Sequence, residues 1–326
     1  MKNNLLITGG AGFIGSNFIN MLNNINTSEF NSIVNVDKLT YAANTDNIKV
    51  CDDINYIFYK IDICDSSLVS EVLKRHNINY IINFVAETHV DNSILNPSVF
   101  VKTNVLGTAN LLNCAKDYWQ NNYENKKFIQ ISTDEVYGSL SDDKDLKFTE
   151  SSPLEPHSPY SASKASADLL VLSYYYTYKF PVVITRCSNN YGPNQHKEKL
   201  IPLIIYNALN NLPIPIYGDG MNIRDWINVK DYCSAILNVL HNGRIGEIYN
   251  VGANTEKTNI EVVNMILDYL NKPRTLIKYI EDRLGHDRRY GIDASKIIKE
   301  LGWKPIISFK EGIKNTIEYY RKCFII

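Results

Sequence analysis

Gly9-Gly10-Ala11-Gly12-Phe13-Ile14-Gly15 stands between a short apolar run, residues 5–7, and an amphipathic stretch, residues 13–23. Glycines at 9, 12 and 15 give the pattern G-x-x-G-x-x-G, in which missing side chains let the backbone turn tightly and approach a pyrophosphate. The amphipathic stretch predicts a helix whose N-terminus offers free N–H groups to that anion. The segment therefore predicts a strand, a turn and a helix that bind a dinucleotide. The alternative is a tight turn that binds no ligand.

Apolar runs and amphipathic stretches continue to alternate through the first half of the chain. The runs predict strands, and the stretches between them predict helices. The strands are expected at 32–36, 56–60, 80–85, 127–132 and 182–185, and the helices at 67–75, 97–118 and 159–178. This order predicts an α/β fold, namely a Rossmann-like, doubly wound parallel sheet with helices on both faces.

The texture of the sequence changes after about residue 186, where Pro, Gly and Asn become more frequent. Shorter strands are expected at 214–217, 226–229 and 247–251, and helices at 200–209, 229–240 and 259–270. These elements predict a smaller mixed α/β lobe that binds the substrate. We expect a dinucleotide-binding domain at 1–186, to which segments near 220–250 can contribute, and a substrate lobe at 187–326.

Charge and composition limit the function classes. The 326 residues carry a net charge of -1, which gives no general attraction to nucleic acid or anionic membranes. No run approaches the length of a membrane span, and the N-terminus lacks the apolar segment of a signal peptide. The cysteines at 51, 64, 114, 187, 233 and 323 form no C-x-x-C pair, and no His/Cys cluster has zinc spacing. We expect a cytoplasmic protein with reduced, buried thiols and no metal, nucleic-acid or membrane partner.

An acidic residue ends the second predicted strand. Asp37 can accept hydrogen bonds from both ribose hydroxyls of NAD, whereas it would repel the 2′-phosphate of NADP. Asp62 ends the third strand, near the expected position of the adenine. Lys38 argues in the other direction, because a lysine can pair with a 2′-phosphate. The sequence favours NAD.

A tyrosine and a lysine lie four residues apart in Tyr160-Ser161-Ala162-Ser163-Lys164, so they share a helix face. Ser158 is a candidate N-cap, and Pro159 fits the first helical turn. A lysine ammonium stabilises phenolate, so Tyr160 can act as a base toward a substrate hydroxyl. The same spacing occurs on solvated helix faces. The position after the fifth strand favours catalysis.

Two adjacent carboxylates follow the fifth strand in Thr133-Asp134-Glu135. The carboxyl ends of strands in an open parallel sheet face the ligand. Close carboxyl groups can divide into a protonated acid and an ionised base. The alternative is a polar loop that turns at Gly138.

The glycine segment, Asp37, Tyr160 and Lys164 together resemble the extended short-chain dehydrogenases that act on nucleotide sugars. Thr133-Asp134-Glu135 is similar to the signature of the dTDP-glucose 4,6-dehydratases within that family. The resemblance covers essentially the whole chain. It implies conversion of dTDP-glucose to dTDP-4-keto-6-deoxyglucose and water, through oxidation at carbon 4, elimination across carbons 5 and 6, and hydride return to carbon 6. The product leads to rhamnose and other deoxysugars.

The resemblance also implies a role for each catalytic group. Tyr160 takes the proton of the 4-hydroxyl, and Thr133 hydrogen-bonds the same oxygen. Glu135 removes the proton from carbon 5, and protonated Asp134 donates to the leaving 6-hydroxyl. Lys164 holds the nicotinamide ribose. A homodimer packed through 97–118 and 159–178 is implied as well.

The remaining implied contacts concern NAD and the nucleotide sugar. Cofactor contacts are implied for Gly9, Gly12, Phe13, Ile14, Gly15, Asp37, Lys38, Leu39, Thr40, Asp62, Ile63, Phe84, Ala86, Thr88, Thr103, Tyr160, Lys164 and Asn190. Substrate contacts are implied for Thr88, Thr133, Asn189, Lys199, Leu200, Pro215, Tyr217, Arg224, Asn259, Arg283 and His286, with the run 282–289 completing the pocket. The sequence departs from the family pattern at Asn92, where Arg is frequent, and at Leu284, where Pro is frequent.

Three alternative functions stay open. The chain can be a nucleotide-sugar 4-epimerase, a dehydratase for a UDP-, CDP- or GDP-linked sugar, or an NAD-sensing scaffold that keeps the fold without the chemistry. The Thr133-Asp134-Glu135 triplet favours dehydration. The intact Tyr160 and Lys164 argue against a scaffold.

Overall fold

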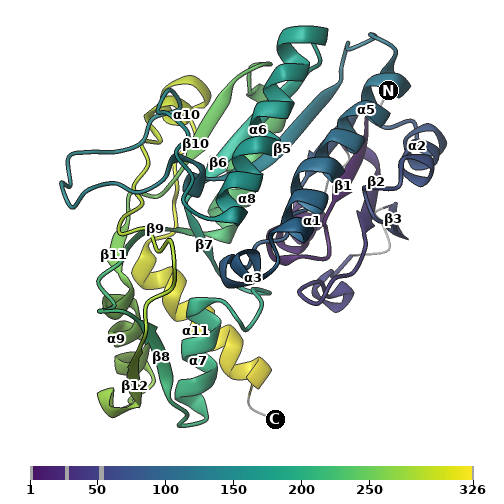
Figure 1. Cartoon of the computed structure of the whole chain (residues 1–326). Helices are drawn as coiled ribbons and strands as arrows, with labels where there is room; N and C mark the ends of the chain where they lie inside the picture. Colours follow the sequence, from purple (N-terminus) through teal and green to yellow (C-terminus); the bar gives the residue numbers. More distant parts are fainter. Residues whose placement is uncertain (1–2, 26–28, 51–54, 325–326) are drawn as a thin grey trace.

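A parallel sheet of seven strands forms the centre of the computed structural model, which describes residues 3–25, 29–50 and 55–324 (Figure 1). The strand order is β10-β6-β5-β4-β1-β2-β3. The strands are β1 (Asn3–Thr8), β2 (Phe30–Asp37), β3 (Tyr56–Lys60), β4 (Tyr80–Asn83), β5 (Lys127–Thr133), β6 (Val182–Cys187) and β10 (Ile248–Val251). The α/β prediction and the doubly wound sheet are confirmed.

Helices cover both faces of the sheet, because successive side chains of each strand point to opposite faces. Leu5 and Ile7 of β1 pack toward α1 (Phe13–Asn24), α8 (Val229–Asn242) and α10 (Ser295–Leu301). Leu6 packs on the opposite face toward α2 (Ser66–Arg75), α5 (Gly107–Trp119) and α6 (Pro159–Tyr178). Both faces are therefore buried, as parallel sheets require.

A smaller lobe lies below the sheet in Figure 1. It contains the sheets β11-β9-β7 and β12-β8 and three helices around a core that includes Tyr191, Trp226 and Phe309. The strands are β7 (Asn189–Tyr191), β8 (Ile214–Tyr217), β9 (Ile223–Asn228), β11 (Glu256–Thr258) and β12 (Ile277–Ile280), and the helices are α7 (Leu200–Leu209), α9 (Asn259–Tyr269) and α11 (Phe309–Phe324). The expected mixed α/β texture is present.

The helix expected at 97–118 is not uniform. It begins as α4 (Pro97–Phe100), widens into a π-helical segment at Val101–Leu106, and continues as α5; the short helix α3 (Val90–Leu95) precedes it. The helices α10 and α11 and the strands β7, β11 and β12 were not expected. Three short 3-10 helices complete the described elements, namely η1 (Thr45–Asn47), η3 (Asp134–Tyr137) and η4 (Arg274–Leu276). β10 pairs with β6 although it follows residue 187, and the division of the chain at 186 stays a prediction.

The strand order reverses direction at β1, which has β2 on one side and β4 on the other. In open α/β sheets a ligand binds at such a switch point, beyond the carboxyl ends of the strands. Gly9 follows β1 there, and Phe84 follows β4. The topology therefore places a ligand site where the glycine segment lies.

Candidate active site

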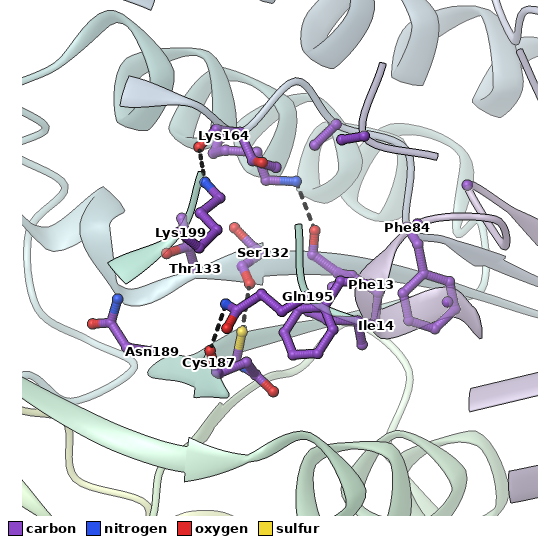
Figure 2. Close-up of a pocket in the computed structure, with 18 of the residues that line it drawn as sticks. Phe13, Ile14, Phe84, Ser132, Thr133, Lys164, Cys187, Asn189, Gln195 and Lys199 are labelled. Carbon is purple, nitrogen blue, oxygen red and sulfur yellow. Dashed lines mark hydrogen bonds between the residues drawn. The ribbon is translucent and has the colours of Figure 1, made fainter. Parts of the chain in front are cut away.

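A cavity of about 260 Å³ opens at the carboxyl ends of β1, β4, β5 and β6 (Figure 2). A second cavity of about 80 Å³ extends toward the end of β2 and shares part of the same lining. The expected residues that line the larger cavity are Gly9, Gly12, Phe13, Ile14, Gly15, Phe84, Ala86, Thr88, Thr133, Asp134, Glu135, Tyr160, Lys164, Asn189, Asn190 and Lys199. Those that line the smaller one are Gly9, Gly12, Asp37, Lys38, Thr40, Asp62, Ile63, Phe84, Ala86 and Thr103. The fold thus gathers the expected catalytic residues and, except for Leu39, the expected cofactor residues around two cavities that share part of their lining.

The glycine segment leaves room for a phosphate group. Gly9 has φ of +75°, and a Cβ there would lie 2.8 Å from Val85 N. A Cβ on Gly15 would lie 2.5 Å from Gly9 O. A Cβ on Gly12, in contrast, would meet only Gly9 O at 3.3 Å, so this position opens into both cavities. Gly12 also precedes α1 without a side-chain cap. The N–H groups of the first turn are therefore suited to a pyrophosphate.

Asp37 and Lys38 border the smaller cavity. Asp37 accepts hydrogen bonds from Ala11 N at 3.0 Å and Leu39 N at 2.8 Å. Burial raises the pKa of Asp37, and these two N–H groups oppose the rise. Lys38 Nζ donates to Thr103 Oγ1 at 3.0 Å and lies 3.9 Å from Asp62. Lys38 already contacts Thr103 and Asp62, so its ammonium is less available to a 2′-phosphate. This weakens the argument that the site prefers NADP. Asp62 lies two residues beyond the end of β3, not at the strand terminus as expected.

The helix α6 carries the tyrosine and the lysine into the larger cavity. Its start is fixed by a capping box between Ser158 and Ser161 and by Pro159 at its first position. Lys164 Nζ donates to Ile131 O at 2.7 Å. The pKa of Tyr160 is raised well above its usual value, first by burial and then by the charge of Glu135. The Lys164 ammonium is directed to a backbone carbonyl, and its stabilisation of the Tyr160 phenolate stays a prediction.

The two acids after β5 experience different surroundings. Asp134 is 1% exposed, and its Oδ2 has no hydrogen-bond partner among the described residues. Burial, followed by the charge of Glu135, raises the pKa of Asp134 well above its usual value. Burial also raises the pKa of Glu135, but Arg283, Arg224 and Lys199 oppose that rise. The surroundings therefore favour the protonated form of Asp134, whereas at Glu135 three cations work against the effect of burial.

The expected diphosphate ligand Arg224 is buried between other groups. Its guanidinium carbon lies 4.2 Å from the centre of the Tyr290 ring, and Nη2 donates to Asp287 O at 2.9 Å. Its charge acts on both Asp134 and Glu135. Arg224 contributes to the electrostatics of the site in this structure, and its contact with substrate stays a prediction.

Several expected residues within the described part of the chain line neither cavity: Leu39, Leu200, Pro215, Tyr217, Arg224, Asn259, Arg283 and His286. Two of them meet at Asp91, whose Oδ2 accepts a hydrogen bond from Tyr217 Oη at 3.0 Å and whose Oδ1 lies 3.9 Å from Arg283 Nη1. His286 Nδ1 lies 2.6 Å from Asp282 Oδ1, and burial lowers the pKa of His286 to about 4. The substrate contacts of these residues stay predictions.

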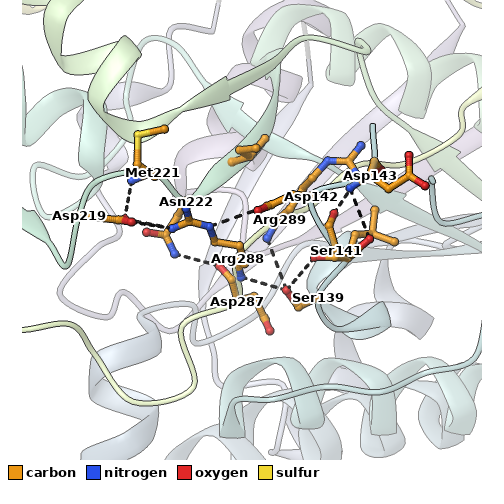
Figure 3. Close-up of polar contacts among 12 residues, drawn as sticks. Ser139, Ser141, Asp142, Asp143, Asp219, Met221, Asn222, Asp287, Arg288 and Arg289 are labelled. Atoms are coloured by element: carbon orange, nitrogen blue, oxygen red, sulfur yellow. Dashed lines mark hydrogen bonds and ion pairs between the residues drawn. The ribbon is translucent and has the colours of Figure 1, made fainter. Parts of the chain in front are cut away.

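The arginines that end the expected pocket run 282–289 bind other parts of the chain (Figure 3). Arg289 donates to Glu256 at 2.7 and 2.9 Å and to Asp143 O at 2.6 Å. Arg288 Nη1 donates to Asp219 Oδ1 at 3.0 Å. These contacts join the segment after η3 to the smaller lobe. Both arginines donate to protein acceptors, and neither lines either cavity.

Some cavity residues were not expected from the sequence. They are Ala42, Ile131, Ser132, Cys187, Ser188, Gln195, His196 and Glu198. Ser132, Cys187 and Ser188 lie at the carboxyl ends of β5 and β6, so the strand-end rule was a usable signal for them. The loop residues around Glu198 carried no such signal. Tyr41 Oη donates to Glu198 Oε1, a cavity residue, at 3.0 Å.

The cysteines and histidines agree in part with expectation. Cys114, Cys187 and Cys233 are buried free thiols, as expected, whereas Cys64 is partly exposed and Cys323 is exposed. The expectation of burial is therefore wrong for the last two, and Cys51 lies outside the described residues. Within the described ranges, no group of three or more His, Cys, Asp or Glu side chains is arranged to hold a metal ion. None of the helices in those ranges has the length and apolar character needed to cross a membrane.

Three features define a dinucleotide-dependent enzyme of the short-chain dehydrogenase type. They are the doubly wound sheet, the glycine segment at its switch point, and the Tyr160–Lys164 pair at the same cavity. Comparison with known proteins narrows this class. The sequence model of the GDP-mannose 4,6 dehydratase family matches residues 6–316. A dTDP-glucose 4,6-dehydratase of Xanthomonas campestris is 49% identical over 97% of this chain and 92% of its own length, and that of Haemophilus influenzae is 48% identical over 97% of both.

Solved structures agree with these relatives. The dTDP-glucose 4,6-dehydratase of Bacillus anthracis, crystallised with NAD, superposes with a TM-score of 0.89 at 48% identity, over 98% of this chain and 97% of that one. The UDP-glucose 4-epimerase of Thermotoga maritima reaches a TM-score of 0.88 at only 28% identity, over 98% and 99%. The chain belongs to the family of the dTDP-glucose 4,6-dehydratases, as its sequence motifs indicated.

Proposed function

We propose that this chain converts dTDP-glucose to dTDP-4-keto-6-deoxyglucose and water, as an NAD-dependent hydro-lyase of deoxysugar synthesis. The observation that carries the proposal is that Asp134 and Glu135 line the same cavity as Tyr160, Lys164 and the glycine segment. The family membership and the relatives crystallised with NAD support both the reaction and the cofactor. We assign NAD binding to residues 1–186 and nucleotide-sugar binding to 187–326.

Residues of the glycine segment, with Asp37 and Lys164, would hold NAD. When bound, NAD supplies the chemistry of accepting a hydride from carbon 4 of the hexose and giving it back at carbon 6. Tyr160 removes the proton of the 4-hydroxyl, and Thr133 orients that oxygen. The pKa of Tyr160 is high in the protein alone, so positive charge in the loaded site is needed to make it a base near neutral pH.

The two acids carry out the elimination. A ketone at carbon 4 acidifies the proton on carbon 5, which Glu135 removes in its ionised form. Asp134, which burial keeps protonated, donates its proton to the 6-hydroxyl as water leaves. Arg224 opposes the rise in pKa at both acids, but the largest charge effect is anionic at Asp134, from Glu135, and cationic at Glu135, from Arg283. This difference supports the division of roles.

We further propose that the chain works as a homodimer in the cytoplasm. Large apolar side chains are exposed on the helical layer formed by α3 to α6, among them Leu95, Leu106, Leu169 and Tyr176. Exposed apolar groups concentrated on one layer favour association with a second copy. The buried free thiols fit a reducing compartment.

Turnover of a panel of nucleotide hexoses, with mass-spectrometric detection of water loss, tests the proposal. We expect dTDP-glucose to lose water and the UDP-, CDP- and GDP-linked hexoses to react poorly. With substrate deuterated at carbon 4, a dehydratase places deuterium on carbon 6, whereas an epimerase returns it to carbon 4. Epimerised product, or no reaction with any sugar, would contradict the proposal.

A further inference from the structure

A pair of opposite charges lies buried beside the cavity, and the proposed reaction makes no direct use of it. Arg186 of β6 donates from Nε to Asp168 Oδ2 on α6 at 2.9 Å, and the two side chains are 2% and 0% exposed. Removing two charges from water costs free energy that their attraction often fails to return. Stability alone is therefore a weak explanation for this pair.

Asp168 connects the catalytic helix α6 to β5, the strand that directly precedes the two acids. It lies one turn beyond Lys164 and two turns beyond Tyr160 on α6, so the three side chains share one side of the helix. Its Oδ2 also accepts a hydrogen bond from Ser132 Oγ of β5 at 3.0 Å. Ser132 itself lines the cavity. The carboxylate therefore links α6 to the carboxyl end of β5.

Arg186 continues this connection to the turn η3, which carries both acids. Its guanidinium carbon lies 4.8 Å from the centre of the Tyr137 ring. Tyr137 is the last residue of η3 and donates from Oη to Asn250 Oδ1 at 2.8 Å. One ion pair thus contacts the helix of the tyrosine base, the end of β5 and the acid-bearing turn.

The charge of Asp168 also acts on Lys164. The titratable groups near Lys164 are Tyr160 and Asp168 on its own helix and Cys187 from β6, while Asp134 and Glu135 act on Tyr160. Burial raises the pKa of Cys187 to about 12, so this thiol is neutral at working pH. Burial lowers the pKa of Lys164, and Asp168 is first among the groups that oppose this. Its carboxylate therefore favours the ammonium form.

We propose that Asp168 and Arg186 are positioning residues for the dehydration: they hold the helix of Tyr160 and Lys164 against the acid-bearing turn. The inference rests on the proposed function, because it assigns these residues to that reaction. Asp168 and Arg186 act through other side chains, since neither lines either of the two cavities described above.

The test compares Asp168→Asn with Asp231→Asn in the full chain loaded with NAD. Asp231 is also buried, and its carboxylate accepts hydrogen bonds from Ile306 N and Ile307 N, away from the cavity. Both variants lose a buried charge, and thermal unfolding reports the cost of each. We measure kcat and KM for dTDP-glucose across neutral and alkaline pH.

We expect Asp168→Asn to lower kcat by about tenfold or more with little change in KM. The alkaline limb of its kcat profile should move to lower pH, because Lys164 then loses its proton more easily. Asp231→Asn should lower stability and leave the kcat profile unchanged. Equal kcat profiles for the two variants would overturn the proposal.

A double variant, Asp168→Asn with Arg186→Met, separates catalysis from folding. Removing both members of a buried pair often restores stability, so this protein folds even where the single variant does not. We expect its kcat to stay low and its alkaline limb to stay shifted. Recovery of the wild-type kcat and pH profile would show that the pair is structural only. If the wild-type chain fails to dehydrate dTDP-glucose, the proposed function is wrong. If the wild-type chain dehydrates it normally and the variants do not behave as expected, only the positioning role is wrong.

Discussion

Replacing Glu135 by Gln removes the proposed base and nearly preserves its shape. In the structure Arg283, Arg224 and Lys199 stabilise its ionised form, and the amide cannot take a proton from carbon 5. Loss of a general base lowers a rate by about 10² to 10⁴. That range corresponds to about 3–5 kcal/mol of transition-state stabilisation. We expect elimination to slow by this amount.

The same substitution should leave the first oxidation working. The charge of Glu135 is the second cause, after burial, that raises the pKa of Tyr160. Without that charge the phenol loses its proton more easily, so the acid limb of the oxidation should move to lower pH. NAD is then reduced by the first oxidation and is not reoxidised, because the sugar that accepts the hydride at carbon 6 is not formed.

Single-turnover absorbance follows reduced cofactor, and mass spectrometry follows water loss from the sugar. We expect reduced cofactor to accumulate while water loss stalls. Glu150→Gln is the matched control, since Glu150 is a partly buried carboxylate that accepts a hydrogen bond from Asn250 N and lines neither cavity. Dehydration at the wild-type rate by Glu135→Gln would refute the assigned role.

Four further outcomes follow from the geometry. The pKa of Asp134 is higher in the folded than in the unfolded chain, so the stability contributed by this carboxyl falls as pH rises from the unfolded pKa through the folded pKa. At neutral pH, urea unfolding of Asp134→Asn should show a free energy of unfolding about 1–2 kcal/mol higher than that of the wild type. The variant should not dehydrate the sugar. Gly15→Ala should lower thermal stability by about 1–3 kcal/mol, because its Cβ would lie 2.5 Å from Gly9 O. Gly12→Ala should unfold like the wild type and bind NAD more weakly by calorimetry, since its Cβ would meet only Gly9 O at 3.3 Å; equal NAD affinities of the Gly12→Ala and wild-type proteins would contradict this. Glu198→Gln should release labelled NAD faster, because the hydrogen bond from Tyr41 Oη weakens; an unchanged exchange rate would exclude that contact as a closure.

The first half of the fold was accessible from the sequence because its signals are local. The third predicted strand, 56–60, and the predicted helix 159–178 match β3 and α6 residue for residue. In the second half the elements predicted at 200–209 and 214–217 match α7 and β8 in the same way, whereas several shorter elements were missed. β7 and β11 have three residues each, too few for a period-two pattern. In the first half, the π-helical segment Val101–Leu106 was missed because it lies inside the helix expected at 97–118.

The residues of the site also differ in how well the sequence predicted them. Tyr160 and Lys164 could be paired by spacing within one helix, and the glycine segment by its place between strand and helix. Cavity residues such as Glu198 and Gln195 come from a loop whose sequence carries no periodicity. Arg224 illustrates the opposite case, because its residue type suggested a phosphate ligand, whereas only the structure shows that it lies against Tyr290 and backbone carbonyls.

The sequence by itself determined the residue types, the strand–turn–helix order and the motif that distinguishes a dehydratase from an epimerase of the same fold. Tertiary structure decided how the electrostatic surroundings of two adjacent carboxyl groups differ. Asp134 and Glu135 are neighbours with almost the same chemistry, and burial raises the pKa of both. Cationic residues far away along the chain, Arg283, Arg224 and Lys199, oppose that rise at Glu135, because charges interact according to distance in space.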